Sequence, residues 1–188
     1  MMRIITGSAR GVKLLTLEGV ETRPTAERTK EAVFSMLQFD IEGRRVLDMF
    51  SGSGQMALEA LSRGASSAVM LDKSKSATEI IRKNAEKTKL IDKCSIYCTD
   101  FKDYLLRNKG DKFDIVFIDP PYASDLVKRS LLLLVETDAV KPTTIIVCES
   151  NLQNNIEDDE AVRKLYKVVK SCKYGVAYIN ILTPKGED

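Results

Sequence analysis

The chain has 188 residues, of which 44% are hydrophobic and 30% are charged, with a net charge of +2; this composition is typical of one soluble globular domain. It contains no histidine, which excludes a Ser-His-Asp triad, an imidazole general base and a histidine-bound metal centre. The four cysteines lack the paired spacing of a zinc site, and no apolar run approaches the roughly 20 residues that span a bilayer, so we expect a cytoplasmic protein without metal or membrane.

The N-terminal 40 residues differ in pattern from the rest of the chain. Two short strand-like runs, at residues 3–6 and 12–15, flank a glycine-containing loop and predict a β-hairpin. An amphipathic helix is expected over residues 25–38, because apolar side chains recur there at helical spacing. We therefore expect a single domain, in which residues 1–40 form an N-terminal appendage and residues 41–188 form the core.

Short apolar runs alternate with helical stretches in the core. The runs are expected to be strands and lie at residues 45–50, 68–72, 95–98, 113–118 and 144–148. The helices between them are expected at residues 55–62, 74–89, 101–107 and 126–135. Two further runs, at 165–172 and 176–182, are joined by a short connection that forces antiparallel pairing. The alternation predicts a doubly wound α/β sheet that is mixed at one edge.

A glycine turn follows the first core strand. Gly52 and Gly54 stand between that strand and the next helix, where glycine lets the backbone approach a ligand closely. With Ala57 the spacing is Gly-x-Gly-x-x-Ala, which resembles a dinucleotide fingerprint. An ordinary structural turn would explain the same residues, so the turn alone does not identify a ligand.

Aspartates stand near the ends of four of the expected strands, at positions 48, 72, 100 and 119. Ligands of open α/β sheets bind outside the carboxyl ends of the strands, so we expect these carboxylates to surround one site. Asp72 lies about 20 residues beyond the glycines, where a carboxylate can hold the ribose of NAD or of S-adenosylmethionine alike. Any one of these aspartates could instead cap the helix that follows it.

Asp119-Pro120-Pro121-Tyr122 directly follows the fourth core strand. Two consecutive prolines stiffen the loop and leave its carbonyls facing outward. Asp119 and the Pro120 carbonyl can accept hydrogen bonds from an NH₂ group, which leaves the nitrogen lone pair aimed at an electrophilic methyl group. Tyr122 can stack on a flat base. A rigid turn is the alternative explanation, but the combination favours methylation of an exocyclic amino group on a nucleic-acid base.

The tetrapeptide resembles the amino-methyltransferase motif (Asn or Asp, Pro-Pro, aromatic), and residues 50–54 resemble the cofactor loop of that superfamily. The matching segments of one branch are Arg3-Ile4-Ile5-Thr6-Gly7, Thr22-Arg23-Pro24-Thr25, Leu47 to Gly54 and Glu59 to Gly64. From Arg3 to about Leu182 the chain is similar to the bacterial 16S ribosomal RNA guanine-N2 methyltransferases, the RsmD family. The resemblance implies a class I S-adenosylmethionine-dependent methyltransferase with a Rossmann-like sheet of seven strands, the last antiparallel.

The resemblance also implies roles for individual residues. It places S-adenosylmethionine against Asp48, Phe50, Ser51, Gly52, Gly54, Asp72, Lys73, Asp100, Phe101 and Asp119. Within this set, Asp72 would hold the ribose, Asp100 and Phe101 the adenine, and the two glycines the methionine moiety. The catalytic residues would be Asp119, Pro120 and Tyr122. The expected partner is 16S ribosomal RNA or the small ribosomal subunit, contacted by Arg10, Lys13, Arg23, Thr25 and Tyr122.

Several alternatives share parts of this pattern. An adenine-N6 methyltransferase of DNA or RNA, or a protein-glutamine methyltransferase, would use the same loop, usually with Asn at its first position. A nicotinamide oxidoreductase would give the Pro-Pro loop no role. A non-catalytic RNA-binding assembly factor on the same fold would not need Asp119. On physical grounds the residues do not choose between guanine and adenine, and they leave the target nucleotide, the assembly state of the RNA and the oligomeric state open.

Overall fold

The computed structural model describes residues 2–17, 24–121, 125–151, 159–174 and 177–186. In these residues seven strands form one sheet in the order β3-β2-β1-β4-β5-β7-β6. The strands are β1 (Arg45–Asp48), β2 (Ser67–Asp72), β3 (Cys94–Cys98), β4 (Phe113–Ile118), β5 (Val140–Asn151), β6 (Tyr166–Tyr174) and β7 (Ala177–Pro184). The first five are parallel, and β7 runs antiparallel to both of its neighbours. The expected mixed sheet with an antiparallel last strand is confirmed.

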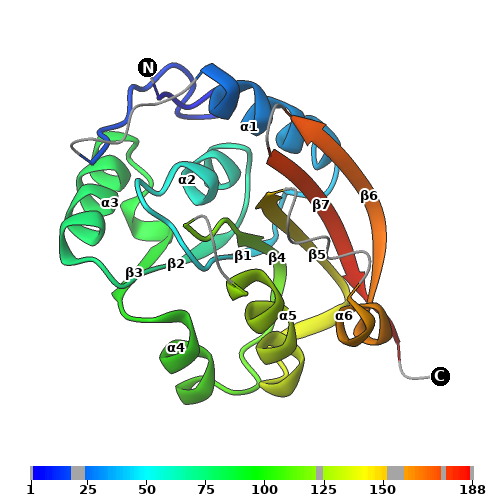
Figure 1. The fold of residues 1–188 in the computed structure, drawn as a ribbon. Coiled ribbons are helices and arrows are strands. Elements are labelled where there is room, and N and C mark those ends of the chain that lie inside the picture. The colour runs from blue at the N-terminus through cyan, green and yellow to red at the C-terminus, as the bar shows by residue number, and fades with distance from the viewer. Residues whose placement is uncertain (1, 18–23, 122–124, 152–158, 175–176, 187–188) are drawn as a thin grey trace.

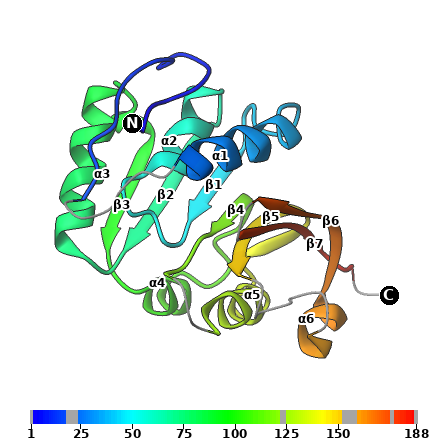
Figure 2. The same cartoon turned by 45° about the horizontal axis from the view of Figure 1, so that its top comes forward.

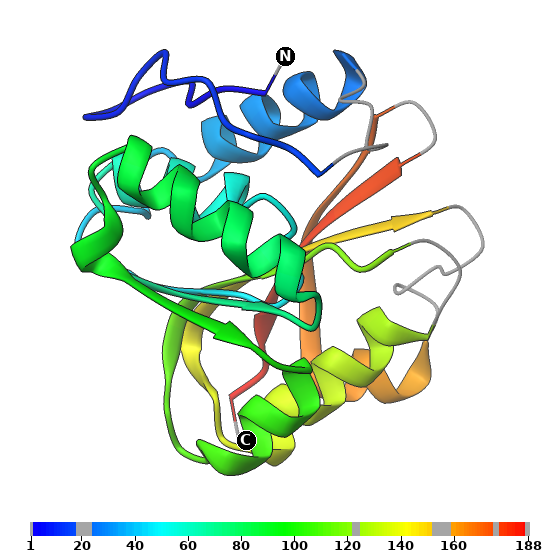
Figure 3. The ribbon, with the colours of Figure 1, turned by 90° about the vertical axis from the view of Figure 1, so that its left-hand side faces the viewer.

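Helices cover both faces of the sheet (Figures 1 and 2). They are α1 (Pro24–Met36), α2 (Gln55–Ser62), α3 (Lys75–Lys87), α4 (Phe101–Arg107), α5 (Leu126–Glu136) and α6 (Glu160–Leu165), with a short 3₁₀ helix at Ile91–Lys93. In Figure 3, α1, α2 and α3 lie on one side of the sheet and α4, α5 and α6 on the other. No helix in the described ranges is long and apolar enough to cross a membrane.

Two hydrophobic cores follow from this three-layer arrangement. Successive residues of a strand face opposite sides, so Phe117 packs under α1, against Phe34, while its neighbour Val116 packs toward α4 and α5. Cys148, expected to act as a small core hydrophobe, is fully buried in the second core. Because both faces of the central strands are covered, those strands are apolar along nearly their whole length.

The N-terminal appendage departs from its prediction in detail. The hairpin is reduced to a single antiparallel bridge between Arg3 and Lys13, so residues 2–17 form an arm with little strand structure. The helix expected at residues 25–38 is present as α1, from Pro24 to Met36. The arm lies over α2 and α3, on the same side of the sheet as α1 (Figures 2 and 3). Its backbone amides bond partly to carbonyls within the arm and partly to side chains of those helices, Glu59, Ser62 and Asn84.

Candidate active site

The carboxyl ends of the central strands bring the predicted aspartates to one edge of the sheet. Asp48 is the last residue of β1 and pairs in register with Phe117 of β4. Asp72 is the last residue of β2, beside Cys98 at the end of β3. Asp119 directly follows β4, and Asp100 stands two residues beyond the end of β3. The expectation that these carboxylates gather at one edge is therefore met by the geometry.

The glycine turn is fixed to this edge by its own backbone. The Ser51 amide donates to the Leu71 carbonyl at 2.9 Å, and the Gly52 amide donates to Asp72 Oδ2 at 2.9 Å. Gly54 has φ +79°, and a Cβ there would lie 3.2 Å from Ile81 Cγ2. Gly52 also has a positive φ, of +53°, but a Cβ there would meet no atom within 4 Å. The turn is thus packed against the core at Gly54 and open at Gly52, where a ligand can approach the backbone.

Asp72 connects the glycine turn to the start of α3. Its Oδ1 accepts from the Ser74 amide at 2.8 Å, and its Oδ2 holds Gly52. Each carboxylate oxygen keeps a further lone pair, so this half-buried side chain can still accept hydrogen bonds from hydroxyl groups. Lys73, expected beside it at the cofactor, has an exposed side chain.

The residues expected at the adenine lie at the start of α4. Phe101 is buried, and its ring packs against that of the half-buried Phe50, with 5.2 Å between ring centroids. Asp100 is exposed, and its Oδ1 accepts from the Lys102 amide at 2.9 Å. Asp100 is therefore an N-cap of α4 as well as a residue of this edge, so capping explains in part why an aspartate stands at this position.

Asp48 is the least solvated carboxylate of the edge. Only 2% of the residue is exposed, and its Oδ2 has no hydrogen-bond partner among the described residues. Burial raises the pKa of Asp48 to about 7, with a smaller contribution from Asp72, while the amides of Ala57 and Phe50 act in the opposite direction. A buried acceptor without a partner is costly in a folded protein. It marks a position at which a hydrogen-bond donor from a ligand would stabilise the structure.

Asp119 begins the loop that follows β4. The residue is exposed at the surface, but neighbouring protein atoms partly shield its carboxyl group from water. This loss of solvation raises the pKa of Asp119, and the negative charges of Glu149 and Asp48 raise it further. Pro120 is half-buried beside it. Tyr122, the predicted stacking residue, lies outside the described residues.

Glu149 was not predicted to belong to the site, although the rule that selects acidic residues at strand ends would have found it directly after the apolar run 144–148.

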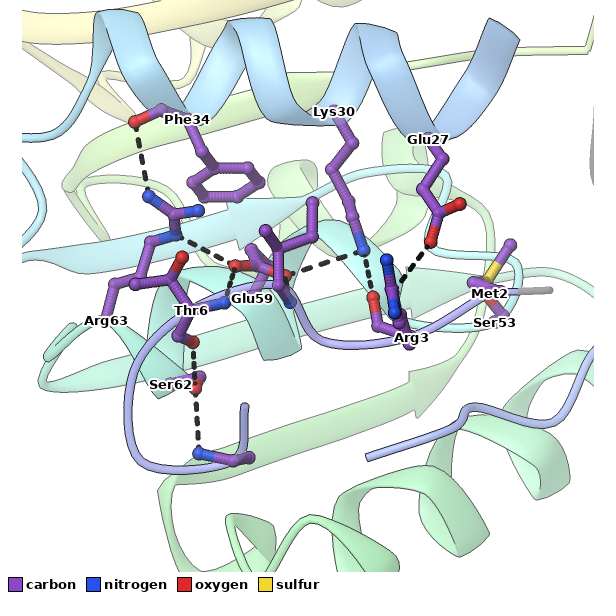
Figure 4. Close-up of polar contacts among 12 residues, drawn as sticks. Met2, Arg3, Thr6, Glu27, Lys30, Phe34, Ser53, Glu59, Ser62 and Arg63 are labelled. Carbon is purple, nitrogen blue, oxygen red and sulfur yellow. Dashed lines mark hydrogen bonds and ion pairs between the residues drawn. The ribbon is translucent and has the colours of Figure 1, made fainter. Parts of the chain in front are cut away.

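The N-terminal arm is held to α2 by the buried carboxylate of Glu59 (Figure 4). Its Oε2 accepts from the Ile5 amide at 2.8 Å, and its Oε1 accepts from the Thr6 amide at 3.0 Å and from Arg63 Nε at 2.9 Å. Lys30 of α1 is also buried and places its Nζ 3.5 Å from Oε2. Burial lowers the pKa of Lys30, and the charge of Glu59 opposes that change. One side chain thus joins the arm, α1 and α2.

A second side chain joins the arm to the glycine turn. Asn84 of α3 is fully buried; its Oδ1 accepts from the Leu15 amide at 2.8 Å, and its Nδ2 donates to the carbonyls of Leu15 and Ser53 at 3.0 and 2.9 Å. The Ser53 hydroxyl also lies 3.0 Å from Met2 Sδ. The conformation of the turn therefore depends on the arm.

The residues predicted to contact RNA are only partly described. Arg10 and Lys13 are exposed on the arm. Arg23 lies outside the described residues, and Thr25 lies in the first turn of α1, with a side chain that also falls outside them. The structure therefore places two of the predicted cationic side chains on the surface and does not bring them into contact with the four aspartates.

Comparison with known proteins gives consistent matches over nearly the whole chain. The family described as conserved hypothetical protein 95 matches residues 2–182. The ribosomal RNA small subunit methyltransferase D of Haemophilus influenzae is 34% identical over 151 residues, which cover 79% of this chain and 78% of that protein. The protein of the same name from Escherichia coli is 32% identical over 155 residues, or 82% and 77% of the two chains. A solved structure from Escherichia coli, named provisionally as the methyltransferase yhhF, has a TM-score of 0.85 and 27% identity and covers 99% of both chains.

Proposed function

This chain belongs to the family of the ribosomal RNA small subunit methyltransferases D, described as conserved hypothetical protein 95, and we propose that it transfers a methyl group from S-adenosylmethionine to the N2 amino group of a guanine in 16S ribosomal RNA. The observation that carries this proposal is the position of Asp119, directly after β4, beside the buried Asp48, which ends the neighbouring strand β1 just before the glycine turn. A donor site for a methyl group and an acceptor site for an amine are thereby adjacent on one sheet edge.

The residues of the edge fit S-adenosylmethionine by their chemistry. Asp48 Oδ2, buried without a partner among the described residues, can accept from the ammonium group of the methionine moiety. The open backbone at Gly52 leaves room for that moiety, and Asp72 has lone pairs for the ribose hydroxyls. Phe50 and Phe101 offer an apolar aromatic surface for the adenine. When bound, the cofactor supplies an electrophilic methyl group on a sulfonium.

Asp119 has two roles in the proposed reaction. Its carboxylate and the Pro120 carbonyl accept hydrogen bonds from the guanine amine, which orients the nitrogen lone pair toward the methyl group. As the new N–C bond forms and the S–C bond breaks, the amine loses a proton, which Asp119 or water accepts. The raised pKa of Asp119 suits a proton acceptor better than the ordinary value of an aspartate does. We assign Tyr122 to stacking on the base and Arg10 and Lys13 to the RNA backbone.

The test is methyl transfer from labelled S-adenosylmethionine to small ribosomal subunits that lack the modification, followed by nucleoside analysis. We expect the label in N2-methylguanosine. Asp119→Asn should reduce the single-turnover rate by at least about 100-fold, since it removes both the charged acceptor and the proton acceptor. Asp92→Asn, at an exposed position on the 3₁₀ helix, is the matched control and should behave as the wild type.

Two outcomes would contradict the proposal at different levels. Label in N6-methyladenosine would identify the adenine-specific alternative and refute guanine. Absence of any transfer to RNA by the wild-type protein, with S-adenosylmethionine bound as shown by calorimetry, would refute RNA methylation altogether.

A further inference from the structure

Glu149 of β5 lies near Asp119, and the proposed function gives it no role. Strands β4 and β5 are parallel, and their register pairs Phe117 with Val147. Both of these side chains belong to the core beneath α1. Glu149 stands two positions beyond Val147 on β5 and so returns to the α1 side of the sheet. Asp119 directly follows β4 and lies close enough to Glu149 for that negative charge to raise its pKa.

The surroundings of this pair are rich in acceptors. Asp48 lies close enough to Asp119 to affect its titration, as Glu149 does, and all three groups are carboxylates. In the part of the chain that the structure describes, no lysine or arginine forms an ion pair with Asp48 or Asp119. Asp119 and Glu149 can each accept a hydrogen bond, so the pair matches a ligand with two adjacent hydrogen-bond donors.

Guanine and adenine differ at this point. Enzymes that modify a base read the flipped base along its Watson–Crick edge. In guanine the reacting N2 amine stands beside N1–H, so the edge offers two neighbouring donors. In adenine the N6 amine also stands beside N1, but that N1 carries a lone pair and would face a negative charge. The pair of carboxylates therefore favours guanine, a choice that the Asp-Pro-Pro-Tyr motif does not make.

We propose that Glu149 determines the base specificity of the site, by accepting a hydrogen bond from guanine N1–H while Asp119 accepts from the reacting amine. This inference rests on the proposed function and adds a reason for guanine over adenine. Glu149 touches the base without exchanging a proton with it. Its loss should therefore change which base is accepted more than it changes cofactor binding.

The discriminating substrate is 2-aminopurine, which keeps the amine at C2 but has an acceptor at N1 in place of N1–H. The nucleotide that the wild-type protein methylates is first mapped, and ligated small-subunit RNA is then prepared with guanosine or 2-aminopurine riboside at that position. The second-order rate constant of methyl transfer under single-turnover conditions is compared for the wild type, Glu149→Gln and Glu160→Gln. Glu160 lies at the exposed start of α6 and serves as the matched control, since its side chain is 83% exposed.

We expect the wild type and Glu160→Gln to prefer guanosine by at least about 100-fold, because a site built around an N–H donor rejects the analogue that lacks it. In Glu149→Gln the carboxamide can donate to N1 of 2-aminopurine, so the preference should fall by at least about tenfold. Affinity for S-adenosylmethionine, measured by calorimetry, should stay within a few-fold of the wild type.

An unchanged preference in Glu149→Gln, with folding and cofactor affinity intact, would overturn the role of Glu149 and leave the proposed function standing. If Glu149→Gln fails to fold, Glu149→Asp keeps the carboxylate and should keep the preference for guanosine at a reduced rate; loss of the preference in that variant would also overturn the proposal. Failure of the wild type to methylate the guanosine RNA would instead refute the proposed function.

Discussion

The buried carboxylate of Asp48 makes the stability of the ligand-free protein depend on pH. Its pKa is raised from 3.8 to about 7 in the folded chain, so the folded state binds this proton more tightly than the unfolded state does. The stabilising contribution of the protonated group is complete below about pH 4 and is lost as the pH rises through about 7. Between pH 5 and pH 8 the loss is on the order of 2 to 3 kcal/mol, because each tenfold difference in proton affinity between the two states corresponds to about 1.36 kcal/mol.

The substitution that tests this reasoning is Asp48→Asn, which keeps the shape of the side chain and removes its titration. We expect the free energy of unfolding of the wild type, from urea denaturation without cofactor, to fall relative to that of Asp48→Asn by about 2 to 3 kcal/mol between pH 5 and pH 8. The same substitution should weaken binding of S-adenosylmethionine by about tenfold or more, because a charged acceptor is lost. Parallel pH profiles for the two proteins would refute a buried, titrating Asp48.

Two further perturbations test the support of the site. Glu59→Gln leaves Lys30 and Arg63 without their buried counter-charge and should lower the free energy of unfolding by about 3 to 5 kcal/mol in urea denaturation. The control Glu160→Gln should stay within about 0.5 kcal/mol of the wild type. A loss in Glu59→Gln as small as that of the control would contradict a stabilising role for the ion cluster of Glu59, Lys30 and Arg63. Gly54→Ala should destabilise more than Gly52→Ala, because both require a left-handed backbone but only the former meets Ile81 and Met70. Gly52→Ala should mainly weaken cofactor binding in calorimetry, and an unchanged affinity there would show that no ligand approaches that position.

The central part of the fold follows from local patterns in the sequence. Apolar runs of strand length, four of them with an aspartate at or near the end, predict a parallel sheet whose carboxyl edge collects those aspartates, and this edge is where they lie. The start of α3 is likewise local, because Ser74, a residue type favoured at helix N-termini, caps the helix by accepting from the Ala77 amide. These features depend on residues close together in the chain.

The parts that were missed depend on distant residues or on short elements. The arm shows little of the expected hairpin because the amides of Ile5, Thr6, Ala9 and Leu15 bond to side chains between 53 and 69 residues later in the sequence, those of Glu59, Ser62 and Asn84. No local pattern reports such pairing. Helix α6 has only six residues, and its Asp159 cap is hidden within an acidic segment. Glu149 was missed because the strand-end pattern was read for aspartate alone, although this glutamate directly follows the apolar run 144–148; hydrogen bonding to β7 carries β5 on to Asn151.

The attachment of the arm to α2 and α3 has a consequence for how the protein is made. The arm is synthesised before its binding partners, Glu59, Ser62 and Asn84. Residues 5–9 can dock once α2 has been made, but until α3 has emerged Leu15 lacks its partner and the glycine turn lacks the support that Asn84 provides through Ser53. The cofactor site therefore depends both on the arm and on Asn84, and it reaches its final conformation only after the first half of the sheet has formed.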